Sequence, residues 1–244
     1  MRARRTRTAG LALGAALAAA LPAVAAPAAD AAPTRTARAF VAAFTTATSE
    51  ARAAVPAVAP AVERLAPCVE LALGAPEREA DHAVVVALTA AVSDGVVAPL
   101  LPVLTRLQTA LDAIPTQDAA LRSVRALWRK QLTDLRAFPS GAQLCEQLTA
   151  WRAGGWKGAA RPQLPPVLEA QTPEAELLAA ERKLDRAARR LRALGASRTD
   201  AARVDGDRLV APVADAHEKA LERVLPDDGR YGVDVKDAER FNRR

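Results

Sequence analysis

The chain has 244 residues, of which 34 are Lys or Arg and 28 are Asp or Glu, so its formal net charge is +6. Half of the residues are hydrophobic, and no segment alternates apolar and polar residues over the length of a strand, which argues against a β-sheet. Two His, two Cys and one Tyr supply few general bases or nucleophiles, so the composition argues against an enzyme.

The first 31 residues have the pattern of a secretory signal peptide. Four arginines precede the alanine-rich apolar run Ala9–Ala26, and small-residue cleavage patterns place the mature start at Ala29 or Ala32. An uncleaved membrane anchor is the alternative, but the apolar run is short, with Pro22 near its end, whereas a spanning helix needs about 20 apolar residues. We therefore predict a secreted or periplasmic protein of bacterial composition.

Removing this leader halves the net charge. The leader holds four Arg and one Asp, which leaves 30 basic and 27 acidic residues and a net charge of +3 from residue 32 onward. Much of the apparent basicity is therefore targeting signal, and an exported protein rarely meets nucleic acid. We expect no nucleic-acid partner.

Helical periodicity then continues to Trp156, and we expect residues 32–156 to form an up-and-down helical bundle. Apolar residues recur at three- and four-residue spacing, and prolines and glycines divide the pattern into segments. Thr116 is the expected N-cap of the fourth helix, and Ser140 with Gln143 fits a capping box that opens the fifth. The expected helices cover residues 34–55, 57–73, 76–114, 116–138 and 140–153.

The most apolar stretch after the leader, Ala83–Leu104, is the expected centre of this bundle. Pro99 and Pro102 each remove a helical hydrogen bond, so we expect one kinked helix or two helices that meet near Asp94. Asp94 is expected to cap the second half; pairing with an arginine or lining a pocket are the alternatives. The stretch is long enough to span a membrane, but the carboxylate of Asp94 near its centre disfavours this alternative. We therefore expect no integral membrane segment after the leader.

Cys68 and Cys145 are the two cysteines of the chain. In an oxidising compartment the simplest interpretation is one disulfide between them. A catalytic thiol is the alternative, but no histidine is close to either cysteine in the sequence. The predicted disulfide would join the second and fifth helices.

The C-terminal third begins with a Pro- and Gly-rich linker, residues 157–171. Residues 172–225 are expected to form a helical hairpin that either packs on the bundle or extends from it, and residues 226–244 are expected to be a polar, flexible tail. The first helix of the hairpin is basic. Its candidate contacts to an anionic surface are Arg182, Lys183, Arg186, Arg189 and Arg190, although a charge run is commonly a solvated face.

Candidate ligand or metal residues are few. Glu79 and His82 share a helical face, as in di-iron bundles, but the second Glu-x-x-His pair that such a site needs is absent. A site that joins His82 to His217 is the remaining metal hypothesis, whereas the apolar neighbours of His217 favour a buried packing role. The three tryptophans are expected to cluster in the core, with a tryptophan-walled ligand pocket as the alternative.

The sequence contains no Gly-x-Ser-x-Gly, phosphate-binding glycine loop, His-Glu-x-x-His or Cys-x-x-Cys motif. We therefore predict no cofactor and an exported, non-catalytic helical protein. Its expected role is an envelope or extracellular interaction module that binds an anionic component. A carrier of a small apolar ligand and a metal-binding protein built on Glu79 and His82 are the alternatives.

Overall fold

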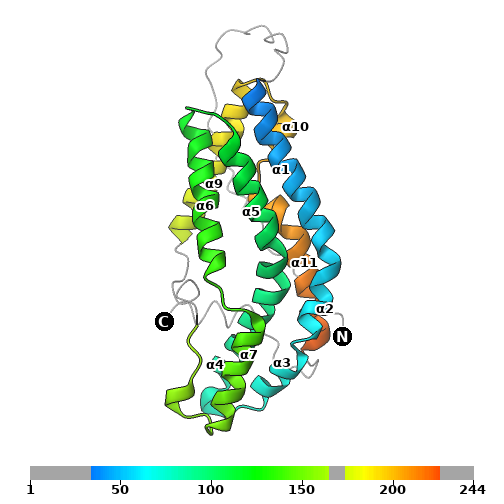
Figure 1. Cartoon of the computed structure of the whole chain (residues 1–244), viewed down its shortest axis with the longest axis vertical. Coiled ribbons are helices and arrows are strands. Elements are labelled where there is room, and N and C mark those ends of the chain that lie inside the picture. Colours follow the sequence, from blue (N-terminus) through cyan, green and yellow to red (C-terminus); the bar gives the residue numbers. More distant parts are fainter. Residues whose placement is uncertain (1–33, 165–173, 226–244) are drawn as a thin grey trace, which may run out of the picture. The chain divides into compact units, whose positions relative to one another are not determined.

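A computed structural model describes residues 34–164 and 174–225, which all belong to one compact unit, Ala32–Arg244. The described residues form helices and connecting turns without a strand, which confirms the all-α class (Figure 1). The expected signal peptide, the expected C-terminal tail and residues 165–171 of the expected linker lie outside the described residues, whereas residues 157–164 of the linker are described.

The helices follow the expected segments, with two additional divisions: the short helix α10 separates from the second helix of the hairpin, and the second segment of the bundle divides as well. The second segment separates into α2 and α3, because the chain turns at Arg64–Leu65 just before Pro67. The α-helices are α1 Arg35–Ala54, α2 Val58–Glu63, α3 Ala66–Leu73, α4 Glu77–Val92, α5 Ala98–Ala113, α6 Ala119–Arg136, α7 Gly141–Ala153, α9 Glu174–Ala193, α10 Arg198–Ala201 and α11 Gly206–Val224. Two short 3₁₀ turns, η1 Val55–Ala57 and η3 Gly158–Ala160, and the π-turn η2 Ser93–Val97 complete them.

The helix starts follow local capping chemistry. Ser140 and Gln143 form the expected capping box of α7, in which each side chain accepts a hydrogen bond from the other residue's backbone N–H. The expected N-cap at Thr116 is wrong. Asp118 caps α6 instead and accepts from the Ala120 and Leu121 N–H groups, while Thr116 accepts from the Asp118 N–H.

The central segment is one helical run, Glu77–Ala113, with a π-turn in its middle. Pro99 cannot donate the α-helical bond to the Gly95 carbonyl, which weakens the hydrogen-bond ladder at this point. Here the Ala98 N–H donates to the Ser93 carbonyl, five residues back. The break that the prolines predict is therefore a widened turn, and α4, η2 and α5 are continuous in the chain (Figure 1).

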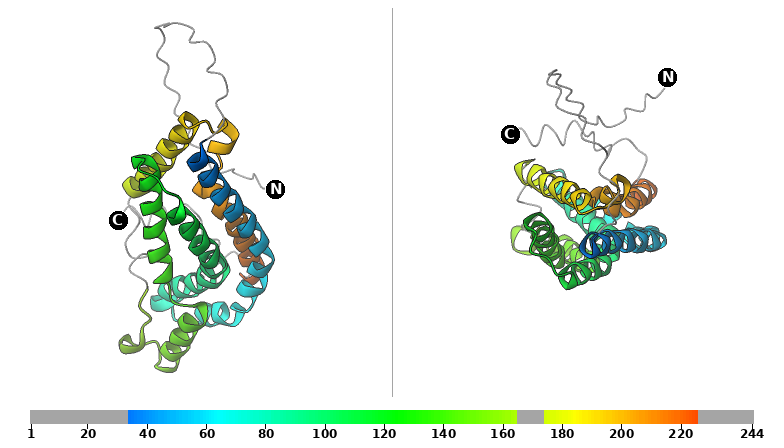
Figure 2. Two further views of the ribbon diagram at one scale, coloured as in Figure 1. Left: turned by 45° about the horizontal axis from the view of Figure 1, so that its top comes forward. Right: turned by 90° about the horizontal axis from the view of Figure 1, so that it is seen from above.

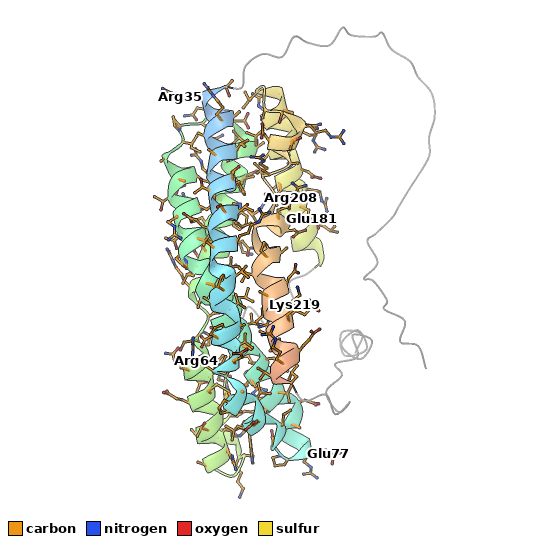
Figure 3. The ribbon with its side chains drawn as sticks, turned by 90° about the vertical axis from the view of Figure 1, so that its right-hand side faces the viewer. Arg35, Arg64, Glu77, Glu181, Arg208 and Lys219 are labelled. Carbon is orange, nitrogen blue, oxygen red and sulfur yellow. A yellow bond between two sulfur atoms is a disulfide. The ribbon has the colours of Figure 1, made fainter. Side chains whose placement is uncertain are left out.

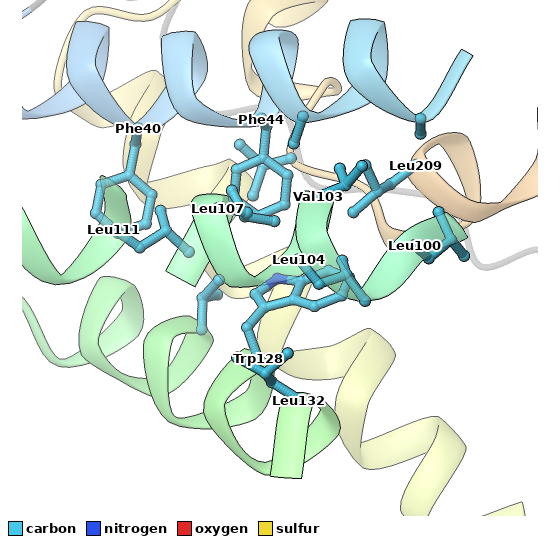
Figure 4. Packing of buried hydrophobic residues seen from close by; sticks show 14 of the residues in the cluster. Phe40, Phe44, Leu100, Val103, Leu104, Leu107, Leu111, Trp128, Leu132 and Leu209 are labelled. Carbon is cyan, nitrogen blue, oxygen red and sulfur yellow. The ribbon is translucent and has the colours of Figure 1, made fainter. Parts of the chain in front are cut away.

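Two hydrophobic cores lie along this run. The larger core takes side chains from α1, α2, α5, α6, α9, α10 and α11, and the long helices surround it in Figure 2. Phe40 and Phe44 of α1 point toward the α5 leucines Leu107 and Leu111, and Trp128 of α6 enters from the other side (Figure 4). The smaller core joins α3, α4 and α7 around the fully buried Trp151.

The two cores occupy different ends of the bundle. Figure 3 places Arg35, at the start of α1, and Glu77, at the start of α4, at opposite ends. The π-turn contacts α2 and α11 between them. Residues that sit at η2 therefore lie where the two halves of the bundle meet.

The C-terminal helices pack on the bundle and do not extend from it. Ala187 and Leu191 of α9 and Leu209 and Val213 of α11 are fully buried in the larger core. The principal contacts of α9 are with α6, and those of α11 are with α1 and α2. The first two residues of the expected hairpin, 172 and 173, lie outside the described residues.

An ion pair fixes α9 to the start of α6. Arg190 donates from Nε to the Asp118 carboxylate, whose other oxygen caps α6. Partial burial opposes ionisation of Asp118, but Arg190 and the capping N–H groups outweigh it and hold the pKa of this carboxyl below its usual value. Arg190 is therefore a structural contact as well as part of the basic helix.

The disulfide between Cys68 and Cys145 is confirmed. It joins α3 to α7 with the two Cα atoms 5.5 Å apart, within the usual range for a disulfide. Both helices pack on α4, so the covalent link lies across the first half of the central run.

The central run is long and apolar enough to cross a membrane, by length and composition alone. Half of its most apolar window is buried by other parts of the bundle. Core helices of soluble proteins have the same composition, because neighbouring helices replace lipid as their apolar surroundings.

Candidate functional site

Asp94 lies in the π-turn and holds the start of α7. Its Oδ1 accepts a hydrogen bond of 2.7 Å from the Gly141 N–H, the first residue of that helix. A carboxylate at this position complements the positive end of the α7 dipole. The expectation that Asp94 caps its own second half is wrong, because α5 has no side-chain cap and the carboxylate faces α7.

Ser93 strengthens the same contact. Its hydroxyl donates to the Pro139 carbonyl in the turn before α7. A Cβ on Gly141 would lie 2.6 Å from the Asp94 carboxylate and 2.8 Å from the Ala90 carbonyl oxygen. Only glycine therefore allows α7 to start this close to the central run.

Gly95 follows Asp94 in the π-turn and allows α11 to approach the central run from another side. A Cβ there would lie 2.6 Å from Cδ2 of His217 and 2.7 Å from a methyl group of Val62. His217 is only 7% exposed, and its Nε2 is buried without a hydrogen-bond partner among the described residues. The packing role that its apolar neighbours favour agrees with this position.

Burial lowers the pKa of His217, and its hydrogen bond to the Ala91 backbone only partly opposes the shift. The folded protein therefore holds this ring neutral at a pH where the unfolded chain is already protonated. The sign follows from proton linkage: the unfolded state binds more protons, so the free energy of unfolding falls as the pH drops through about 6.5.

We predict that His217→Gln removes this acid sensitivity, because glutamine does not titrate. The wild-type free energy of unfolding should fall with a limiting slope of about 1.4 kcal/mol per pH unit below the unfolded pKa, in addition to any slope from carboxylates. Urea unfolding at several pH values would measure the difference between the two proteins. Equal slopes for wild type and His217→Gln would contradict the prediction.

His82 is half-buried and packs against the smaller core, apart from His217. Its Nε2 is 2.9 Å from the Pro162 carbonyl oxygen, and its ring stands edge-on to Trp151 at 5.5 Å. His217 contacts the run at Ala91 and Gly95, so the two imidazoles are at least nine residues apart along it, roughly 14 Å of helix rise. The structure does not bring the two histidines together.

No group of three or more His, Cys, Asp or Glu side chains in the described ranges is placed to hold a metal ion. Glu79 is half-buried on α4, one turn before His82. The pair that the sequence singles out therefore has no third ligand from the described helices.

The tryptophans divide between the two cores. Trp151 and Trp156 pack edge to face, with ring centroids 4.9 Å apart. Trp128 packs against Phe44 in the larger core. The expected cluster of three tryptophans is wrong, because α6 carries Trp128 into the larger core, while Trp151 of α7 and Trp156 just after that helix belong to the smaller one.

The structure brings Asp94 and the disulfide to one surface hollow. This hollow has a volume of about 360 Å³, and its lining includes Arg64, Asp94 and both cysteines. Asp94 faces it while bonded to α7. The disulfide, which links cysteines 77 residues apart in the sequence, thus closes α3 onto α7 beside Asp94.

The basic residues of α9 are largely at the surface. Arg182, Arg186 and Arg189 are exposed and Lys183 is half-buried, while Arg190 pairs with Asp118. Nε of Arg182 donates to the Leu178 carbonyl and Nε of Arg186 to the Arg182 carbonyl. Both side chains therefore lie back along their own helix, with guanidinium groups still at the surface.

The neighbouring helix α6 is also basic, which its sequence alone did not make evident. α6 and α9 pack side by side. Together they hold eleven Arg or Lys and five Asp or Glu, a net charge of +6, whereas residues 32–244 as a whole have a net charge of +3. We call α6 and α9 the basic helix pair. The exposed cations on α6 are Arg122, Arg129, Lys130 and Arg136.

Comparison with known proteins gives no family: no family model, no curated protein and no solved structure matches this chain.

Proposed function

We propose that the chain is an exported, non-catalytic binding module that attaches to an anionic component of the cell envelope through the basic helix pair. The supporting observation is charge segregation: α6 and α9 carry +6 together, so the rest of the chain from residue 32 has a net charge of −3. The positive electrostatic field of two neighbouring basic helices attracts polyanions to that side of the molecule.

The elements that hold α9 in place fit this role. Arg190 binds the α6 N-cap and Leu191 is buried in the core, so the exposed arginines are presented from a fixed helix. The disulfide is compatible with an oxidising, extracytoplasmic compartment. The central run would act as the core helix of this module, covered by its neighbours, and not as a membrane anchor.

The test is salt-dependent binding to vesicles that contain an anionic phospholipid, with zwitterionic vesicles as the reference. Each basic residue near an anionic membrane contributes about 1 kcal/mol. Reversing Arg182, Arg186 and Arg189 to Glu should therefore weaken binding by roughly 100-fold or more. High salt should abolish wild-type binding, since it screens exposed charges.

A matched control variant separates the effect of where the charges lie from the effect of the net charge on binding. Arg78, Arg152 and Lys157 are exposed cations near the other end of the bundle, and reversing them to Glu changes the net charge by the same amount. This control should keep most of the wild-type affinity. Equal loss in both triple variants, or no wild-type binding to anionic vesicles or to isolated cell-wall polymer, would refute the proposal.

A further inference from the structure

A polar groove runs between α1 and the α10–α11 segment, on elements that the basic helix pair does not include. Its volume is about 770 Å³, within the range of small-molecule sites. The α1 wall presents short hydroxyl side chains, including Thr45 and Thr48, which leave space above the helix. The opposite wall is the first half of α11, where Figure 3 labels Arg208 beside α1.

Three arginines converge on this groove from different parts of the chain. Arg52 comes from the last turn of α1, Arg203 from the turn after α10, and Arg208 from the first turn of α11. Arg203 also donates from Nη1 to the Thr45 Oγ1 at 3.4 Å, a contact that spans 158 residues of sequence. The fold therefore assembles a cluster of guanidinium groups that no local motif encodes.

These guanidinium groups remain available for a ligand. Arg203 and Arg208 approach Asp200 and Asp205 at 3.7 and 3.6 Å, as pairs only three residues apart in the sequence. Such exposed pairs contribute little free energy. Arg52 has no ion pair among the described residues.

The lining also defines the class of ligand. Three guanidinium groups favour a phosphate, which they bind through paired N–H donors. The same groove holds one carboxylate, Asp215, which accepts hydrogen bonds and repels a second anionic group. A ligand that carries one phosphate and neighbouring hydroxyl groups would match both the arginines and Asp215.

We propose that the groove between α1 and α11 binds a phosphorylated polyol, with Arg52, Arg203 and Arg208 on the phosphate and Asp215 on a hydroxyl. A glycerol phosphate unit has this chemistry, whether it comes from a lipid headgroup or from a soluble or polymeric source. The site uses other helices than the basic helix pair, so it does not depend on the function proposed above.

The experiment titrates the full-length mature chain with glycerol 3-phosphate by calorimetry. Arg52→Gln and Arg208→Gln should each raise the Kd about 10-fold, as expected for one charge-assisted hydrogen bond. Arg35→Gln, an exposed arginine at the start of α1, is the matched control and should bind as the wild type does. Circular dichroism of each variant verifies that the helices are retained.

Asp215→Asn tests the polyol half of the site. The wild type should prefer glycerol 3-phosphate to inorganic phosphate, and Asp215→Asn should bind inorganic phosphate more tightly and lose that preference. Displacement of glycerol 3-phosphate by phosphatidylglycerol vesicles would assign a lipid source, and failure of displacement a soluble or polymeric one.

Two results would overturn the proposal: no binding of glycerol 3-phosphate to the wild type, or binding that Arg52→Gln and Arg208→Gln leave unchanged. The Arg182, Arg186 and Arg189 triple variant separates the two proposals. It should lose vesicle binding through the basic helix pair but keep the wild-type Kd for glycerol 3-phosphate.

Discussion

Removing the disulfide is expected to lower the free energy of unfolding by about 4 kcal/mol, in the chain-entropy account of a closed loop of this length. Cys68 and Cys145 are separated by 77 residues, and the loop between them holds α4, η2, α5 and α6. Opening that loop gives the unfolded chain many more conformations. The Cys68→Ala, Cys145→Ala double variant and the reduced wild type should lose similar amounts.

Urea unfolding of the oxidised wild type, the reduced wild type and the double variant would measure this loss. Cys68 is buried in the smaller core, so the alanine variant also loses some packing, and reduction of the wild type separates the two effects. The single variant Cys145→Ala should resemble the double variant, since either substitution opens the loop. A reduced protein as stable as the oxidised one would contradict the prediction.

The composition of the smaller core explains why the disulfide should stabilise one end of the bundle more than the other. It contains α3, α4 and α7, and it is built largely from alanine and valine side chains around Trp151 and three leucines, Leu65, Leu144 and Leu148. Small side chains bury less apolar area per residue than the Phe and Leu layers of the larger core. We therefore expect reduction to loosen α3 and α7 first, which amide hydrogen exchange of the two ends would reveal.

Local signals in the sequence predicted the helices well. Ser140 and Gln143 define α7 because both partners of the capping box lie within one turn. Gly195 ends α9 with a positive φ of 89°, which glycine adopts without strain. The cysteine pair was predictable as well, since two cysteines allow only one intramolecular disulfide.

Contacts between distant segments were less predictable. The sequence located a break at Asp94, but its partner is the N–H of Gly141, 47 residues away. Nothing near Asp94 in the sequence distinguishes this partner from a cap within its own helix. The arginines of the groove, at positions 52, 203 and 208, are also brought together only by the packing of α11 on α1.

The π-turn links these distant contacts. Ser93 and Asp94 hold the start of α7 while Gly95 receives α11 and α2, so three consecutive residues join both halves of the bundle. A widened turn redirects the side chains that follow it relative to a regular helix. Pro99 explains why the turn forms at this point of the chain. The contacts with α2, α7 and α11 also require the turn to be there, because they depend on the side chains that it directs.

Gly95→Ala is expected to destabilise the fold by about 3 kcal/mol, near the upper end of the usual cost of overpacking. The added methyl would meet His217 and Val62 at 2.6 and 2.7 Å, and both side chains are buried, so neither can move into solvent. In a solvent-exposed helix the same change stabilises by up to about 1 kcal/mol. The sign of the change in unfolding free energy therefore tells whether the methyl group is accommodated or meets its neighbours.

Gly206→Ala is the matched control, because a Cβ there would make only ordinary contacts at 3.7 Å or more. It should be neutral or stabilising. Truncating the neighbours should relieve the strain of Gly95→Ala: in double-mutant cycles, His217→Ala and Val62→Ala should each cost less in the Gly95→Ala background than in the wild type. Additive costs would show that the methyl does not meet these side chains, and α11 would then have to reach the central run through other contacts.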